Sequence, residues 1–323
     1  MKIGITFDLR TDSNEDSAEF DKISTIEHIE STLGSLGYET ERIGNFKDLL
    51  RELNSYNVYS ECDMIFNICE GLYGVGREAQ VPALLDAHRI PYTFSDPFVL
   101  CLTLNKGMTK RIIRDAGLPT APFTIINKIQ DIYDIKLNYP LFVKPNGEGS
   151  GIGINGNSKV NNLQELKNVC LLCLPYSLNP LYPLIIEEYL PGREFTVGII
   201  GTGDESVLLG CMEINFNSDE KLYSYNMKTN YEEFITYTLP EEEMSKKVCD
   251  LALKSWKLLG CRDAGRIDVR LDENGVPNFI EVNPLAGLNK DTSDLPILAK
   301  MNGYSYEFII ENIVNSAKKR IKK

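Results

Sequence analysis

The chain has 323 residues, of which 43% are hydrophobic and 25% are charged, a composition that is ordinary for a soluble globular protein and a length that predicts two or three domains. With 46 acidic against 34 basic residues the net charge is −12, which argues against nucleic acid as a partner. No apolar run approaches the ~20 residues of a membrane helix, and the start MKIGITFDLR lacks the apolar region of a signal peptide. We therefore expect a cytoplasmic protein with no membrane partner.

Histidine and cysteine offer little support for a metal centre or a catalytic triad. Only His28 and His88 are present. Six cysteines stand in apolar contexts and are expected to be reduced core thiols: Cys62, Cys69, Cys101, Cys211, Cys249 and Cys261. Cys170 and Cys173 form a C-x-x-C, which is a redox pair, half of a metal site or, as its helix-like apolar setting favours, a structural feature. Carboxylates and lysines must carry any chemistry.

The first ninety-odd residues alternate short apolar strands with helical patterns. Strands are expected at 2–7, 39–43 and 64–68, with helices at 21–36 and 45–53 between them. This βαβαβ order predicts a parallel, doubly wound sheet that binds ligands at the carboxyl ends of its strands. The loop after the third strand carries Glu70, Arg77, Glu78 and Gln80, which fits either a small-molecule loop or an ordinary solvated one.

A helix is expected at 100–116, stopped by Gly117 and Pro119. It places Lys106 and Lys110 one turn apart on one face, and a solvated lysine face is the commoner meaning of such a pair. Next comes the stretch FVKPNGEGSGIGI at 142–154. Its glycines allow backbone N–H groups to approach a phosphate closely, so it indicates a polyphosphate site, with a glycine-rich hairpin as the alternative.

Two late strands carry acids where a core strand is normally apolar. GRIDVRLD at 265–272 and NFIEVNPLAG at 278–287 are expected to form a hairpin. Period-two alternation lets Asp268, Glu281 and Asn283 converge, and clustered oxygen ligands on rigid strands suit Mg²⁺ with substrate phosphates. The alternative is an ion-pair lattice on an exposed sheet face.

A further expected strand pair, IIEEYLPGREFTVGII, places Glu187, Glu188 and Glu194 in apolar surroundings. Buried acids need partners. A purine amino group and a pair of ribose hydroxyls are suitable partners, and Leu190 can offer backbone contacts to the edge of a base.

Together these motifs resemble the ATP-grasp superfamily and, within it, the D-alanine:D-alanine ligase family. The matching segments run in order along nearly the whole chain: GREAQVPALLD, RIPYTFSDP, LNKGMTK, AGLPTAPF, PLFVKPNGEGSGIGI, IIEEYLPGREFTVGIIG, GCRDAGRIDVRLDENG, FIEVNPLAG and TSDLP. The resemblance implies an α/β, three-domain ATP-grasp fold. A doubly wound parallel sheet (1–95) would precede two α+β domains that clamp ATP, a central one with a glycine-rich lid loop (96–184) and a C-terminal one with a magnesium-binding hairpin (185–323).

The resemblance also implies an activity and its residues. The activity is ATP-dependent activation of a carboxylate as an acyl phosphate, then attack by an amine to give an amide, with two Mg²⁺ ions that Mn²⁺ can replace. The implied ATP contacts are Lys106, Lys144, Glu148, Gly149, Ser150, Glu187, Glu188, Leu190, Glu194 and Lys228. The implied metal ligands are Asp268, Glu281 and Asn283. Arg266, Ser150 and the backbone of Gly287 would act in catalysis, and Glu70, Ser293 and Asp294 would meet the amino-acid substrates. A homodimer is also implied.

The sequence departs from the family pattern at substrate positions. Glu70 stands where the family usually has a histidine, and Thr229 where a tyrosine usually follows the phosphate lysine. The loop after the first strand is long and carries Asp12, Glu15 and Asp16, which are expected to add negative charge near Glu70, and NPLAGLNKDTSD differs from the usual proline-glycine sequence. We therefore hypothesise that at least one substrate differs from D-alanine and carries an additional amine or a larger polar group.

Other interpretations remain open. Glu70 would merely pair with Arg77 if the pocket accepts D-alanine, as in a genuine D-alanine:D-alanine ligase of peptidoglycan synthesis. A small-molecule kinase would stop at a phosphorylated product, and a non-catalytic ATP-binding protein would not turn ATP over.

Overall fold

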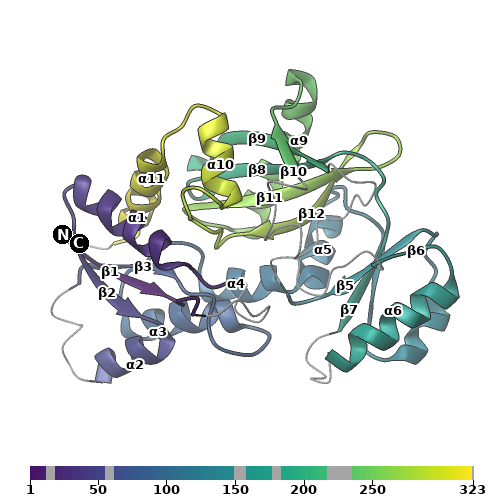
Figure 1. The fold of residues 1–323 in the computed structure, drawn as a ribbon, viewed down its shortest axis with the longest axis horizontal. Coiled ribbons are helices and arrows are strands. Elements are labelled where there is room, and N and C mark those ends of the chain that lie inside the picture. Colours follow the sequence, from purple (N-terminus) through teal and green to yellow (C-terminus); the bar gives the residue numbers. More distant parts are fainter. Residues whose placement is uncertain (12–18, 55–61, 149–157, 177–182, 217–234, 322–323) are drawn as a thin grey trace.

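The computed structural model describes residues 1–11, 19–54, 62–148, 158–176, 183–216 and 235–321, without the side chains of 174–176. Figure 1 shows three sheets: a parallel one at lower left, a four-stranded one at lower right and a five-stranded one above them. Among the described residues, no helix combines the length and the apolar character that crossing a membrane requires. The α/β, multi-domain fold expected from the sequence is confirmed.

The N-terminal sheet is parallel, in the order β2-β1-β3. Its strands are β1 (Lys2–Phe7), β2 (Glu39–Gly44) and β3 (Met64–Ile68). One face packs with α1 (Ile23–Ser35), and the other packs with α2 (Phe46–Asn54) and α3 (Gln80–His88), which follows the 3-10 turn η3 (Arg77–Ala79). Because apolar cores lie on both faces, the sheet is doubly wound as expected.

The single helix expected at 100–116 is wrong, because the chain forms α4 (Pro97–Leu104) and α5 (Lys106–Asp115) with a break at Asn105. Asn105 has extended backbone angles, and its side chain accepts a hydrogen bond from the N–H of Met108. An asparagine that caps a helix satisfies one of the free N–H groups of the first turn. The break places Lys106 at the N-terminus of α5, next to the end of β5.

The central sheet is antiparallel, in the order β4-β7-β5-β6, and helix α6 (Leu163–Tyr176) packs on it. Its strands are β4 (Phe123–Ile126), β5 (Leu141–Pro145), β6 (Lys159–Val160) and β7 (Leu184–Glu188), and the 3-10 segment η4 (Ile129–Asp134) joins the same core. Cys170 lies buried in this core, where burial raises the pKa of its thiol to about 12. The structural interpretation of the C-x-x-C therefore holds, since a buried, protonated thiol is unreactive.

The C-terminal sheet is antiparallel, in the order β10-β9-β8-β11-β12. Its strands are β8 (Glu194–Ile200), β9 (Val207–Phe216), β10 (Ile235–Thr238), β11 (Ala264–Leu271) and β12 (Pro277–Asn283), with the short 3-10 turn η5 (Gly203–Glu205) between β8 and β9. Helix α9 (Glu242–Leu259) covers one face, while α10 (Asp294–Met301) and α11 (Tyr306–Lys318) share a core with the N-terminal sheet. This shared core holds the first and third units together.

The expected pairing of the strands IIEEYL and EFTVGII is wrong. The first, β7, pairs with β4 and β5, whereas the second, β8, pairs with β9 and β11. The Pro191-Gly192 turn carries the chain from one sheet to the other, and a Cβ at Gly192 would lie 2.6 Å from the carbonyl oxygen of Leu271. The change of sheet therefore comes after Glu188, a few residues beyond the expected domain boundary at 184/185.

All eight cysteines are free thiols. The expectation of core thiols is wrong for Cys101, which is exposed on the outer side of α4, and Cys62 is only half-buried. Apolar neighbours in sequence do not bury a residue when its helix turns it outward.

Candidate active site

The hairpin of β11 and β12 brings the predicted metal ligands together. Asp268 lies directly opposite Glu281, and Arg266 lies opposite Asn283. Nη1 of Arg266 donates to both carboxylate oxygens of Asp268 at 2.6 Å, and the hydroxyl of Thr196 donates to Oδ1 at 2.7 Å. Arg266 and Asp268 are each only 8% exposed, so the interpretation as a surface ion-pair lattice is wrong.

The donors of this hairpin fit a divalent cation that shares ligands with a phosphate. Asp268 and Glu281 supply two facing carboxylates and Asn283 an amide oxygen, which are hard oxygen ligands of the kind that Mg²⁺ takes. In the part of the chain that the structure describes, no three Asp, Glu, His or Cys side chains are arranged to hold a metal ion unaided. The set therefore suits an ion that completes its coordination with substrate oxygens and water.

A second charge cluster lies between α5 and the central sheet. Glu187 on β7 forms ion pairs with Lys110 and, at 2.9 Å, with Lys144 on β5, and all three side chains are at most 5% exposed. Burial lowers the pKa of Lys110 to about 8. Burial alone would also lower the pKa of Lys144, but the carboxylates of Glu187 and Glu281 outweigh it and raise that pKa. The ammonium group of Lys144 therefore stays protonated and positively charged.

Lys106 joins this cluster to the hairpin. Its Nζ donates to the carbonyl oxygen of Glu148 and lies 3.3 Å from the carboxylate of Glu281. The amide of Asn146 accepts a hydrogen bond from the N–H of Gly107 at 2.8 Å, which fixes the start of α5 against the end of β5. Because Lys106 is 8% exposed and Lys110 is fully buried, the interpretation as a solvated lysine face is wrong.

The other predicted nucleotide contacts already have protein partners. Glu194 forms an ion pair with Arg270 at 3.1 Å, and Glu188 accepts hydrogen bonds from the backbone and side-chain amides of Asn138 at 2.8 and 2.9 Å. Glu188 thus bonds a different partner from its neighbour Glu187, as expected for adjacent residues of a strand. Leu190 is buried in the connection that follows β7.

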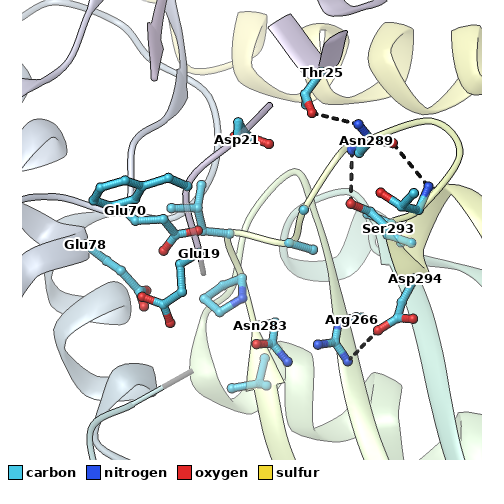
Figure 2. Close-up of a pocket in the computed structure, with 18 of the residues that line it drawn as sticks. Glu19, Asp21, Thr25, Glu70, Glu78, Arg266, Asn283, Asn289, Ser293 and Asp294 are labelled. Atoms are coloured by element: carbon cyan, nitrogen blue, oxygen red, sulfur yellow. Dashed lines mark hydrogen bonds and ion pairs between the residues drawn. The ribbon is translucent and has the colours of Figure 1, made fainter. Parts of the chain in front are cut away.

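A cavity of about 310 Å³ separates the N-terminal unit from the hairpin. Figure 2 shows Arg266, Asn283, Ser293 and Asp294 on its C-terminal side. Asp294 accepts a hydrogen bond from the hydroxyl of Tyr237 at 2.9 Å and lies 3.7 Å from Arg266. Besides these residues, the C-terminal side, α4 and the start of α5 contribute Thr103, Leu104, Lys106, Glu281, Val282, Pro284, Leu285, Ala286, Gly287, Asn289, Thr292 and Leu295.

Gly287 and Ser293 meet at the edge of this cavity. The N–H of Asn289 donates to Oγ of Ser293 at 3.0 Å, and a Cβ at Gly287 would lie 2.8 Å from the same oxygen. Only a glycine therefore lets the backbone come this close to the serine hydroxyl. The structure thus brings the predicted substrate residues Glu70, Ser293 and Asp294 to one cavity together with Gly287.

The N-terminal side of the cavity is acidic. Glu19, Asp21, Glu70 and Glu78 line it, and we call these four residues the acidic wall. Figure 2 shows the carboxylates of Glu19, Glu70 and Glu78 turned toward one another.

Arg77 joins the acidic wall to the start of the glycine-rich stretch. It forms ion pairs with Glu19 at 2.8 Å and with Glu148 at 3.4 Å, and it donates to the carbonyl oxygen of Gly147 at 3.0 Å. The alternative in which Glu70 merely pairs with Arg77 is not what the structure shows, because the guanidinium bonds these other groups.

Several predicted residues lie outside the described residues. They are Gly149, Ser150, Lys228 and Thr229, and the acids Asp12, Glu15 and Asp16 of the first loop. Conversely, Lys110, Thr196 and Glu19 belong to the site although their sequence context predicts no role for them there. An acid, a hydroxyl or a lysine next to apolar residues was the available signal, but only the fold shows that these side chains are buried against the predicted ones.

Comparison with known proteins shows the family of the chain. Residues 112–315, more than half of the chain, match the family model described as the D-ala D-ala ligase C-terminus. A D-alanine–D-alanine ligase of a Marinomonas species is 33% identical over 262 residues, covering 80% of this chain and 78% of the relative. An uncharacterized protein of Sinorhizobium fredii, y4sG, is 30% identical over 299 residues, covering 90% of this chain and 86% of that protein.

The fold is also that of a solved structure. The crystal structure of D-alanine–D-alanine ligase from Bacillus anthracis in complex with ATP aligns with a TM-score of 0.74 at 23% identity, covering 99% of this chain and 98% of that one. The chain belongs to the D-alanine–D-alanine ligase family, in the ATP-grasp superfamily.

Proposed function

We propose that this protein is an ATP-dependent ligase that joins a carboxylate to an amine as an amide through an acyl phosphate. The observation that carries the proposal is the β11–β12 hairpin. Its Arg266, Glu281 and Asn283 line a cavity that Lys106 also lines, and Arg266 forms an ion pair with the buried Asp268 of the same hairpin. Cations, carboxylates and backbone amides without an enzyme nucleophile are what phosphoryl transfer requires, because its catalysis is mainly positioning and neutralisation of charge.

ATP would lie between the central sheet and the hairpin. Lys106 and Lys144 are assigned to its phosphates, together with Glu148, Gly149, Ser150 and Lys228. Glu187, Glu188 and Leu190 are assigned to the adenine and Glu194 to the ribose. The structure of the Bacillus anthracis enzyme with ATP, which shares this fold, supports the assignment of the nucleotide.

Asp268, Glu281 and Asn283 would hold two Mg²⁺ ions, which Mn²⁺ can replace. When bound, these ions neutralise the triphosphate and align it for transfer. The short contact of Lys106 with Glu281 supports this placement, because it brings a phosphate-binding lysine next to a metal ligand.

The proposed reaction has two steps. A carboxylate oxygen of the first substrate attacks the γ-phosphorus of ATP, the bond to ADP breaks, and an acyl phosphate forms. The amine of the second substrate then attacks the acyl carbon, the bond to phosphate breaks, and the amine loses a proton to give the amide. Arg266 and the N–H of Gly287 stabilise the negative charge that develops on the carboxylate oxygens. Glu70, Ser293 and Asp294 contact the amino-acid substrates.

The setting of the enzyme is part of the proposal. We infer a cytoplasmic enzyme with amino-acid substrates and no nucleic-acid or membrane partner. The resemblance to the family also suggests that two copies form a homodimer. The free thiols of all eight cysteines support a reducing compartment. The net charge of −12 supports the exclusion of polyanions.

An ADP-release screen tests the function. Amino acids are offered singly and in pairs with ATP and magnesium, and the products are identified by mass. We expect ADP release that requires a pair and a product equal to the sum of the two minus water. ADP release with one compound and a phosphorylated product would establish a kinase instead. Absence of ADP release with every pair, together with no rise in melting temperature on addition of magnesium-ATP, would refute the ligase proposal.

A further inference from the structure

The acidic wall holds more carboxyl groups than its basic neighbours can pair with. Glu19 is paired with Arg77, whose guanidinium also bonds Gly147 and Glu148. Glu70 and Glu78 form no hydrogen bond or ion pair with any side chain in the ranges that the structure describes. Arg10 and Lys22 also line this side of the cavity, and Lys22 is exposed to solvent.

The titration of these carboxylates reflects the same imbalance. Burial raises the pKa of Glu70 well above its usual range, and the nearby charges of Glu19 and Glu78 raise it further, while Arg77 offsets only part of the increase. Burial and the charge of Glu19 raise the pKa of Glu78 to about 7. Burial also raises the pKa of Asp21 to about 7. Holding these groups close together therefore costs free energy, which a bound cation would reduce.

The acidic wall suits an organic cation. No three acids, histidines or cysteines among the described residues are arranged to hold a metal. An ammonium or guanidinium group needs only carboxylates within hydrogen-bonding reach, and it satisfies two of them at once through separate N–H donors.

The number of carboxylates exceeds what one amino acid needs. An α-amino acid brings one ammonium group, which one carboxylate can balance. Asp21, Glu70 and Glu78 are three carboxylates at one cavity, beyond the Glu19 that Arg77 neutralises. A substrate with a single ammonium group would leave two of these three carboxyl groups without a cationic partner, and each would have to stay protonated in a partly dehydrated site.

We propose that the carboxylate substrate carries a second cationic group, as a diamino acid or a guanidino amino acid does, and that Glu70 and Glu78 bind this group. The inference rests on the proposed function. The orientation of the substrate follows from the groups on the two walls of the cavity. The reacting carboxylate belongs at Arg266 and Gly287, so the cationic end reaches across the cavity to the acidic wall on the opposite side (Figure 2). A cavity of about 310 Å³ is of the size that small-molecule sites have.

The test compares donors that differ in charge and little in size. Ornithine, lysine, arginine and norleucine, in D and L forms, are offered with a panel of amines in the ADP-release assay, alongside D-alanine. We expect kcat/KM for the best cationic donor to exceed that for norleucine and D-alanine by roughly 100-fold, because a site built for a polar group rejects analogues that leave it unpaired. Equal or better turnover of norleucine or D-alanine would overturn the proposal.

Variants locate the effect at the acidic wall. Glu70→Gln, Glu78→Gln and the double variant should each raise KM for the cationic donor, by roughly 10-fold or more in the double variant, with KM for ATP within twofold. Glu242→Gln, at an exposed position of α9, is the matched control and should behave as the wild type. Loss of affinity for ATP as large as that for the donor would show a general structural role and contradict the assignment.

A binding measurement separates this inference from the ligase proposal. The cationic donors should raise the melting temperature of the nucleotide-free protein, norleucine should not, and the double variant should lose the effect. A cation-specific shift without any ADP release would preserve the acidic wall and refute the ligase. ADP release from a neutral pair, without such a shift, would preserve the ligase and refute the cationic donor.

Discussion

Two parts of the candidate active site, the strands with α5 (the strand side) and the loops of the N-terminal unit (the loop side), differ in how their charged groups are paired. On the strand side, each buried charge has a partner within the protein: Lys110 and Lys144 meet Glu187, and Arg266 meets Asp268. On the loop side, Glu70 and Glu78 share one wall and find no ion-pair partner among the described residues. The paired charges are stable without a ligand. The carboxyl groups without an ion-pair partner are stabilised when a cationic ligand binds.

The difference follows from the elements that carry the charges. Residues on β5, β7, β11 and β12 are fixed by the sheet registers, so their charges stay in place for reacting groups without reorganisation. Glu70 follows the end of β3, and Glu78 lies in the short 3-10 turn η3. Residues in such loops can be substituted without disturbing a sheet, which suits a site whose role is to select the substrate.

The largest effect is expected on the strand side. Lys144→Met and Glu281→Gln should each reduce ADP formation by at least about 10³-fold at saturating ATP and magnesium, because Lys144 balances the charge of the triphosphate and Glu281 would hold the magnesium ion that does so. Steady-state kinetics on the folded variants measure this.

Lys254→Met is the matched control, since Lys254 is exposed and forms an ion pair with Asp250 on the same helix. Circular dichroism and a melting curve establish that each variant is folded. Turnover within a few-fold of wild type in either active-site variant would contradict the assignment of the nucleotide site.

A smaller effect is expected at the link between the two sides. Arg77→Met removes the contacts with Glu19, Glu148 and the Gly147 carbonyl, and it leaves Glu19 unpaired. We expect KM for ATP and KM for the carboxylate substrate to rise together by roughly 10-fold, because one side chain orders segments of both sites. Arg51→Met, on the exposed side of α2, serves as the control. A rise confined to one substrate would show that Arg77 serves one site alone.

Much of the strand side could be predicted from sequence. Period-two alternation predicted that Asp268, Glu281 and Asn283 converge, and the hairpin register confirms it. Apolar surroundings indicated that Glu187 is buried. In both cases the geometry involves one strand or two strands joined by a turn, so a short stretch of sequence is enough to predict it.

The loop side was harder to predict because its geometry is not local. Glu70, Glu78 and Glu19 come from separate loops, and only the packing of the N-terminal unit against the hairpin brings them to one cavity. The same reason explains the error at Lys106 and Lys110. Their spacing predicts a shared face of a helix, but whether that face meets water or Glu187 depends on where the central sheet docks.

The smallest expected effect concerns stability and pH. Since burial raises the pKa of Glu78 to about 7 from an ordinary value of 4.5, the folded protein binds more protons here than the unfolded chain between those two pH values. Stability from this group therefore falls as pH rises from about 4.5 to 7, and the penalty is fully present above 7. Glu78→Gln should remove the penalty and raise the melting temperature of the ligand-free protein by a few degrees at pH 8.

Melting curves of Glu78→Gln and the wild type at pH 5 and pH 8 measure this difference. Near pH 5 the two should agree, because Glu78 is then largely protonated in the folded protein. Glu242→Gln, with its side chain exposed, should match the wild type at both pH values. The contrast with the strand side is direct: Glu187→Gln would leave Lys110 and Lys144 without their carboxylate and should lower the melting temperature at pH 8. If Glu78→Gln also lowered the melting temperature at pH 8, the carboxylate of Glu78 would be stabilised within the protein. The strand side and the loop side would then not differ in the way the structure indicates.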